Sequence, residues 1–372
     1  MSFIDELFTS LDMYPATKEA LKFIDQGQLE EVLSTGSDHP LRWMLKGASK
    51  PCSPEALVLG NTEMAIREIF KAENLEAWFK NRMREASRTP EEDTDRYDVL
   101  ATVYKALAEI RAVGYLLQCS FDVTPHSSEG FDLTIRTADE EIAVEVSAVR
   151  MSKPEAEKLA QFRSGKTPGF REEVIQPAGA PKTGELQVDN IAHKFSQKAE
   201  EENRQLPYDS PSLIWLDLQF EDWWSLPAEE AWPLYVLSDG RFRTGGVWLG
   251  FYGRNGISLI DGESMCEGLP RSARGIQHER MRYDGYFYKS DARASGVIIV
   301  WPRCTILYEN PNARHEIPEP VIHKILCLHH FDWPRSWVRP FWKSGAMLCL
   351  KHRVEQTWEM IDCIAEFANL DW

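Results

Sequence analysis

The chain has 372 residues and a formal net charge of −16, from 42 Lys and Arg against 58 Asp and Glu. Hydrophobic residues make up 43 % of the chain, including 13 Trp, which is enough apolar mass for a core and excludes global disorder. The acidic excess argues against a uniformly basic nucleic-acid coat. Residues 271–355 reverse the sign, with 14 basic and 8 acidic residues, so a local basic surface stays compatible with the total.

Cysteine usage and the first residues predict where the protein resides. The seven cysteines are an odd number and form no C-x-x-C pair, which favours a reducing compartment over a disulfide framework. The first thirteen residues carry acids where a signal peptide needs a basic start. No segment approaches the ~20 apolar residues of a membrane helix. We therefore expect a cytoplasmic protein without a membrane partner.

Helical periodicity dominates the first third of the chain. Apolar residues at helical spacing predict short helices at Glu19–Ile24 and Leu29–Leu33, a longer one over Glu63–Arg84 and a long one over Asp95–Leu117. Thr89 and Pro90 are typical of the start of the last helix. We expect residues 1–94 to form a helical N-terminal region.

The periodicity then changes to that of strands and helices in mixed order. Strands are expected at Cys119–Thr124, Phe131–Thr137, Glu141–Val149, Leu213–Phe220, Gly246–Phe251, Gly296–Trp301 and Thr305–Tyr308, with a hairpin turn at 138–140. Helices are expected at 153–162, 188–204, Glu319–Leu328 and Val354–Phe367, and a loop at 164–182. This order predicts an α/β fold with a mixed central sheet flanked by helices over residues 95–372, with a core at 95–220 and an extension of the sheet within 240–372.

Three acidic residues lie at positions where burial of a carboxylate is unfavourable or where a carboxylate could bind a metal ion. Glu109 lies inside the long helix, Asp132 begins a strand, and Glu145 interrupts an apolar strand. A carboxylate in such a strand must be solvated, paired or bound to a cation. Carboxylates on adjacent antiparallel strands can converge, and their oxygens suit Mg²⁺ or Mn²⁺. The alternative is that Glu145 belongs to a solvated strand face and Asp132 to a turn beside Gly130.

The order of helix with acid, strand, strand with Asp, strand with Glu-x-Ser, helix and strand resembles the PD-(D/E)XK nuclease superfamily, which has the restriction-endonuclease-like fold. The resemblance covers roughly residues 95–220. It implies metal-dependent hydrolysis of phosphodiester bonds in nucleic acid, DNA rather than RNA, by an endonuclease or exonuclease. By extension it suggests bacterial defence or a mobile element. It also implies Asp132 and Glu145 as Mg²⁺ (or Mn²⁺) ligands, the Val146 carbonyl as a further ligand, and Glu109 as a helper of a second metal or of a water.

The chain departs from the family pattern at two positions. Phe131 stands for the motif proline, and Ser147 stands for the motif lysine, whose positive charge a hydroxyl does not supply. Lys198 is the first candidate to replace that lysine and Lys194 the second. Both lie on a helix whose Ile191 and Phe195 are expected to pack on the sheet, which brings Lys198 to its rim. The alternative is that both lysines are solvated.

Other motifs leave further alternatives. His329 and His330, with Cys327 and His323, match no zinc spacing, and packing is the better account. The basic and aromatic segment Trp333–Lys343 fits either contact with phosphates and bases or packing in the core.

Two other functional hypotheses stand beside the nuclease. Ser147 and the acidic total motivate a catalytically inactive nuclease-like fold that binds nucleic acid or protein, through the N-terminal helices or as a homodimer. The last hypothesis is an unrelated α/β protein whose acids match the motif by chance.

Overall fold

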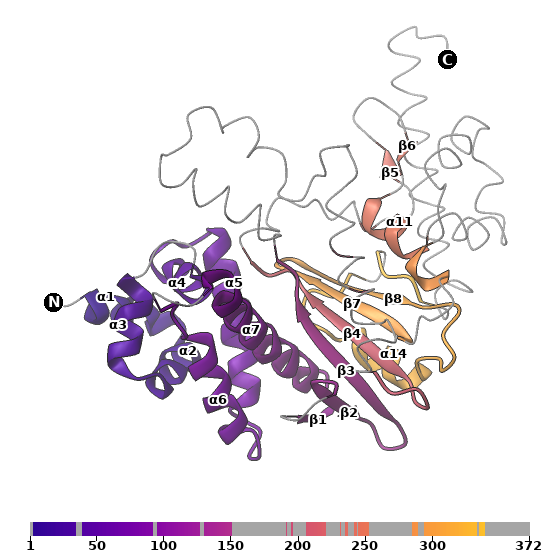
Figure 1. Cartoon of the computed structure of the whole chain (residues 1–372), viewed down its shortest axis with the longest axis horizontal. Helices are drawn as coiled ribbons and strands as arrows, with labels where there is room; N and C mark the ends of the chain where they lie inside the picture. Colours follow the sequence, from indigo (N-terminus) through magenta and orange to yellow (C-terminus); the bar gives the residue numbers. More distant parts are fainter. Residues whose placement is uncertain are drawn as a thin grey trace, which may run out of the picture.

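A mixed six-stranded sheet forms the centre of the protein (Figure 1). The computed structural model describes residues 3–34, 39–91, 95–126, 130–150, 206–220 and 294–332, and the shorter pieces 191, 195, 231, 235–236, 242–243, 245–252, 285–288 and 335–338. The strand order in the sheet is β1-β2-β3-β4-β7-β8. These strands are β1 (Asp122–Pro125), β2 (Leu133–Arg136), β3 (Glu141–Ala148), β4 (Ser212–Asp217), β7 (Gly296–Trp301) and β8 (Cys304–Glu309).

Pairing within the sheet follows the expected hairpins and crossovers. β1, β2 and β3 form an antiparallel meander, and β7 and β8 form a second antiparallel pair. β4 runs parallel to both β3 and β7, so the three central strands need long connections. The predictions that 138–140 is a turn and that residues 296–308 extend the same sheet are confirmed. A separate ribbon pairs β5 (Tyr235–Val236) with β6 (Phe242–Arg243).

Helices precede the sheet and cover its faces. The first six are α1 (Phe3–Ser10), α2 (Pro15–Ala20), α3 (Gln26–Ser34), α4 (Pro40–Leu45), α5 (Pro54–Ile69) and α6 (Glu76–Ala86), with short 3₁₀ turns at Leu11–Met13, Leu21–Phe23 and Lys46–Ser49. They are followed by the long helix α7 (Arg96–Gln118), and later by α11 (Gly246–Tyr252), the 3₁₀ turn η7 (Tyr286–Tyr288) and α14 (Glu319–Ile325). None of the helices in the described part of the chain is long and apolar enough to cross a bilayer.

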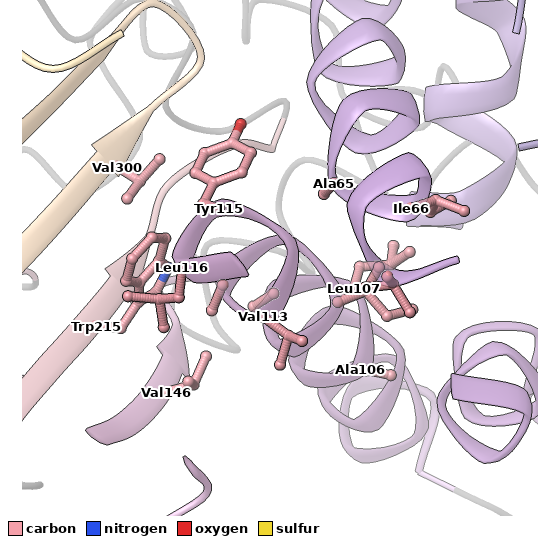
Figure 2. Close-up of a cluster of buried hydrophobic side chains, with 14 of the residues drawn as sticks. Ala65, Ile66, Ala106, Leu107, Val113, Tyr115, Leu116, Val146, Trp215 and Val300 are labelled. Carbon is pink, nitrogen blue, oxygen red and sulfur yellow. The ribbon is translucent and has the colours of Figure 1, made fainter. Parts of the chain in front are cut away.

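Helix α7 lies between the other N-terminal helices and the sheet (Figure 2). On one side Leu107 packs with Ile66 of α5, and on the other Leu116 lies near Val146 and Trp215 of the sheet. The side chain of Asp95 caps the helix by accepting a hydrogen bond from the Tyr97 amide (2.9 Å). The apolar core therefore runs without a break from α2 to β8, through α7.

The two faces of the sheet are covered by different elements. Val146, Trp215 and Ile298 share one apolar cluster with α7 and α14. The opposite face meets an aromatic cluster, in which Phe251 of α11 contacts Phe195 (ring centroids 5.0 Å apart) and Tyr308 of β8 (5.6 Å). Ile191 and Phe195 are helical and buried, as expected.

Three predictions about elements are wrong. Gly246–Phe251 is helical rather than extended, because a short continuous apolar run fits either structure. The expected helix Glu63–Arg84 is two helices, α5 and α6, separated by a turn near residues 70–75. Thr89 does not cap α7: its hydroxyl donates to Glu31, and Asp95 is the cap.

Several other predictions concern residues outside the described ones. The expected helices at 153–162 and 354–367 and the loop at 164–182 lie there, as does most of 188–204. The domain boundary at residue 94 stays a prediction. Helices on its two sides, α5 and α7, share one core.

A buried ion pair joins α7 to the end of β4. Arg111 donates to Asp217 through Nε (2.9 Å) and Nη2 (3.0 Å), and both side chains are 0 % exposed. Gln219, just beyond β4, accepts hydrogen bonds from Asn61 of α5 (2.6 Å) and Tyr115 of α7 (3.3 Å). The two-point geometry suits a fully desolvated guanidinium and carboxylate. It fixes the rotation of α7 against the sheet.

Removing one partner of this pair leaves a buried charge without its counterion. We expect Arg111→Met to lower the free energy of unfolding by about 3–5 kcal/mol, and the double variant Arg111→Met/Asp217→Leu to recover most of that loss. Urea denaturation measures both. The control is Arg136→Met, which removes an exposed pair with Glu141 (2.7 Å) and is expected to cost about 1 kcal/mol or less. Equal losses in the two single variants would contradict the prediction.

Two glycines in neighbouring helices differ in the space available for a side chain. A Cβ on Gly114 of α7 would lie 2.4 Å from both Cα and the carbonyl oxygen of Ala65, whereas a Cβ on Gly60 of α5 meets nothing within 4 Å. We therefore expect Gly114→Ala to destabilise the fold by about 1–3 kcal/mol or more. Gly60→Ala is expected to stabilise it by about 0.5–1 kcal/mol. Thermal melts of the two variants decide this, and a neutral Gly114→Ala would show that the two helices separate freely.

Candidate functional site

The backbone around Asp132 holds its carboxylate at the start of the β2–β3 hairpin. The Asp132 carbonyl accepts a hydrogen bond from the His126 amide (2.8 Å), next to β1. The Asp132 carboxylate accepts one from the Val146 amide of β3 through Oδ2 (2.8 Å). Pairing of β2 with β3 begins only at Leu133, so Val146 lies just beyond the paired residues. The Asp132 side chain supplies the acceptor for its amide. Amides of two other segments therefore hold the backbone and the side chain of Asp132.

Glu145 is the neighbour of Asp132 across the hairpin. In the β2–β3 register Leu133 faces Val144, so the next position along brings Asp132 beside Glu145. Val146 points into the core with α7, and by strand alternation Glu145 and Ser147 belong to the other face. Glu145 is 0 % exposed, so the prediction of a solvated strand face is wrong for this residue.

Helix α7 brings a lysine and the third acid to Asp132. The Lys105 Nζ lies 2.8 Å from Asp132 Oδ1 and 3.7 Å from Glu109 Oε1. Lys105 and Glu109 are one helical turn apart, so both side chains point to the same side of α7. The ammonium group thus bridges an acid of the helix and an acid of the hairpin.

Helix α6 completes the group from the N-terminal region. The Arg82 Nε lies 3.2 Å from Glu109 Oε2, and Arg82 also pairs with Glu85. The side chain of Glu109, 4 % exposed, therefore has a cation at each oxygen. We call Arg82, Lys105, Glu109, Asp132 and Glu145 the acidic cluster with its two cations.

The pKa values of this group reflect burial and mutual charge. Burial and the charge of Asp132 raise the pKa of Glu109 to about 7, against the opposing effect of Arg82 and Lys105. Burial alone would lower the pKa of Lys105. The charge and hydrogen bond of Asp132, with the charges of Glu109 and Glu145, outweigh burial and raise it. All three acids thus act on one ammonium group, and such mutual perturbation is typical of functional sites.

The donor set has the right chemistry for a hard divalent cation. Asp132, Glu145 and Glu109 offer carboxylate oxygens, which Mg²⁺ and Mn²⁺ prefer, and Mg²⁺ keeps several waters, so one or two carboxylates suffice. Lys105 shows that the cluster already accommodates a positive charge. Within the described residues, no three His, Cys, Asp or Glu side chains are gathered closely enough to form a ready metal site.

The remaining predicted site residues have separate outcomes. Lys198 and Lys194 lie outside the described residues, so the prediction that one of them replaces the motif lysine stays open. Ser147 is 4 % exposed. The Val146 amide binds Asp132, and the role of its carbonyl as a ligand stays a prediction.

Two cations were missed by the sequence reasoning. Lys105 and Arg82 read as ordinary polar positions on helical faces, and the partner of each lies on another element. The signal in the sequence was the spacing of Lys105 and Glu109, four residues apart, which places a cation beside the predicted helical acid.

Comparison with known proteins returned no match, whether with family models, curated proteins or solved structures. The likeness to the nuclease superfamily therefore rests on the residues quoted above and their arrangement.

His329 and His330 belong to a packing cluster. The His329 Nε2 lies 3.2 Å from Asn61 Oδ1, and its ring meets Tyr115 of α7 edge-on (5.6 Å between centroids). The two histidine rings lie 3.8 Å apart. The contacts of His329 with Asn61 and Tyr115 are packing contacts between elements of the core.

Burial, followed by the charge of His330, lowers the pKa of His329 to about 4 from 6.5. Because the unfolded chain takes up the proton first, the stability that the neutral ring contributes is present above pH 6.5 and is lost as the pH falls towards 4. We expect His329→Gln to lose less thermal stability than the wild type between pH 7.5 and pH 5. The exposed His323, changed to Gln, is the control and should keep the wild-type pH dependence. Identical slopes in all three proteins would contradict this assignment.

Proposed function

We propose that the chain is a divalent-metal-dependent nuclease that hydrolyses phosphodiester bonds, in DNA rather than RNA. The observation that carries the proposal is the placement of Asp132 against the amide of Val146, the residue after Glu145 in β3, with Glu109 of α7 joined to Asp132 through Lys105. This is the order of acids that the PD-(D/E)XK resemblance implies. A six-stranded mixed sheet with helices on both faces is compatible with a restriction-endonuclease-like fold.

Each residue has a definite task in the proposed reaction. Asp132 and Glu145 would hold the cation, with Glu109 assisting. Such an ion supplies an activated water and offsets negative charge on the phosphate. The hydrogen bonds that Asp132 accepts from the His126 and Val146 amides fix it before any ligand arrives. Arg82 holds Glu109 in place. The DNA preference comes from the resemblance.

One observation favours a second candidate, the inactive nuclease-like module that binds nucleic acid or protein. Both carboxylate oxygens of Asp132 already have partners, Lys105 at Oδ1 and the Val146 amide at Oδ2. A carboxylate neutralised in this way stabilises the fold without a metal. The two candidates differ in one measurable respect, which is cleavage that depends on a divalent ion.

The test is incubation of the protein with supercoiled plasmid, linear duplex, single-stranded DNA and RNA in Mg²⁺, in Mn²⁺ and in EDTA. We expect cleavage only with a divalent ion, and a loss of about 100-fold or more in Asp132→Asn and in Glu145→Gln, because each removes charge that holds the cation. Glu141→Gln is the matched control. Glu141 lies on the same strand but is exposed and paired with Arg136, and its loss should leave the rate unchanged.

The outcomes separate the candidates once thermal melts show that every variant is folded. Binding of nucleic acid without cleavage in any metal would favour the inactive module. Cleavage that survives in both acid variants would mean that the active residues lie elsewhere in the chain.

A further inference from the structure

We infer that Lys105 is the internal counterion of the metal site: it occupies Asp132 when the metal is absent, competes with the metal, and then serves as the positive group that Ser147 does not provide. This inference rests on the proposed function, whose acids it shares. It assigns a role to Lys105 of α7, whose ammonium group and the metal ion would exchange places at Asp132.

The first argument is position. The Lys105 Nζ lies 2.8 Å from Asp132 Oδ1, the oxygen that the Val146 amide leaves available. It also lies 3.7 Å from Glu109, and the charge of Glu145 acts on it as well. One ammonium group therefore sits between two carboxylates, one at the hairpin and one on α7. A divalent cation is drawn to the same place by the same charges.

The second argument is that the ion pair can open. The Lys105 side chain is 42 % exposed, and an ammonium group on a flexible four-carbon stem exchanges partners at small cost. Arg82, 18 % exposed, stays on Glu109 with its Nε 3.2 Å from Oε2. Departure of Lys105 thus leaves Glu109 paired and clears Asp132.

The third argument concerns the charge that the strand lacks. In the Glu145-Val146-Ser147 segment a hydroxyl stands where the resemblance calls for an ammonium group. Lys105 is the described lysine in direct contact with Asp132. Once displaced, it remains tethered one helical turn from Glu109, at the rim of the cluster, where it can face the phosphate that the metal binds.

The experiment compares Mn²⁺ binding, measured by calorimetry, with cleavage at saturating Mn²⁺ for the wild type and Lys105→Met. We expect the variant to bind Mn²⁺ about five- to tenfold more tightly, because its competitor is gone. We expect its cleavage rate to fall at least about tenfold, because the positive group is gone too. Mn²⁺ should also raise the melting temperature of Lys105→Met more than that of the wild type.

Lys80→Met is the matched control. Lys80 pairs with Glu76 one turn away on α6, and its side chain is 37 % exposed, a fraction similar to the 42 % of Lys105. It has no contact with Asp132 or Glu145. Both its Mn²⁺ affinity and its cleavage rate should match the wild type. If Lys105→Met does not fold, Lys105→Gln replaces it in the same comparison, with the same expected results.

The opposing results are distinct. If the wild-type protein cleaves in Mn²⁺ but Lys105→Met binds Mn²⁺ no more tightly than the wild type, the inference is overturned and the proposed nuclease stands. A wild-type protein that neither binds Mn²⁺ nor cleaves any substrate would overturn the proposed function, and the inference with it.

Discussion

The structure depends on a helix that is buried along both sides. Helix α7 packs on α5 through Leu107 and on the sheet through Leu116, and the Arg111–Asp217 pair fixes its rotation. Gly114 allows the backbone of α5 to approach at Ala65. With its position and rotation fixed in this way, α7 directs Lys105 and Glu109 towards the hairpin, with the Lys105 Nζ 2.8 Å from Asp132 Oδ1. A site made from a helix and a strand needs such support, because a shift of an ångström separates its groups.

The net charge of the chain does not predict the balance of charges within the acidic cluster. Three carboxylates meet two cations there, so the local balance differs greatly from the total of −16. Burial is what gives these few charges their strength, since Glu145 and Glu109 are almost without solvent contact. The distribution also explains why Arg82, on a helix of the N-terminal region, belongs to the chemistry of the hairpin. Helix α6 therefore contributes a cation to the candidate site.

The sequence predicts the elements whose signal is local. Regular apolar spacing predicts α7, although not its cap, and alternation about a short turn predicts β2 and β3. The strand predicted at Gly246–Phe251 is wrong because a short continuous apolar run has no periodicity that separates helix from strand. Glu145 became a candidate because an acid in an apolar strand is unusual, and Asp132 became one through the resemblance; the role of both stays a prediction. Lys105 was missed because a lysine on a helix is ordinary, and only the fold brings it to Asp132.

The connections between strands have a consequence for folding kinetics. β3 ends at Ala148 and its neighbour β4 begins at Ser212, and β7 begins only at Gly296, so the central strands pair over long stretches of chain. The acidic cluster, from Arg82 to Glu145, instead lies within α6, α7 and the β2–β3 hairpin. The residues in contact there are closer together in the sequence. Closing short loops costs less entropy than closing long ones. The charged cluster is therefore able to assemble early, on a nucleus to which the rest of the sheet is added later.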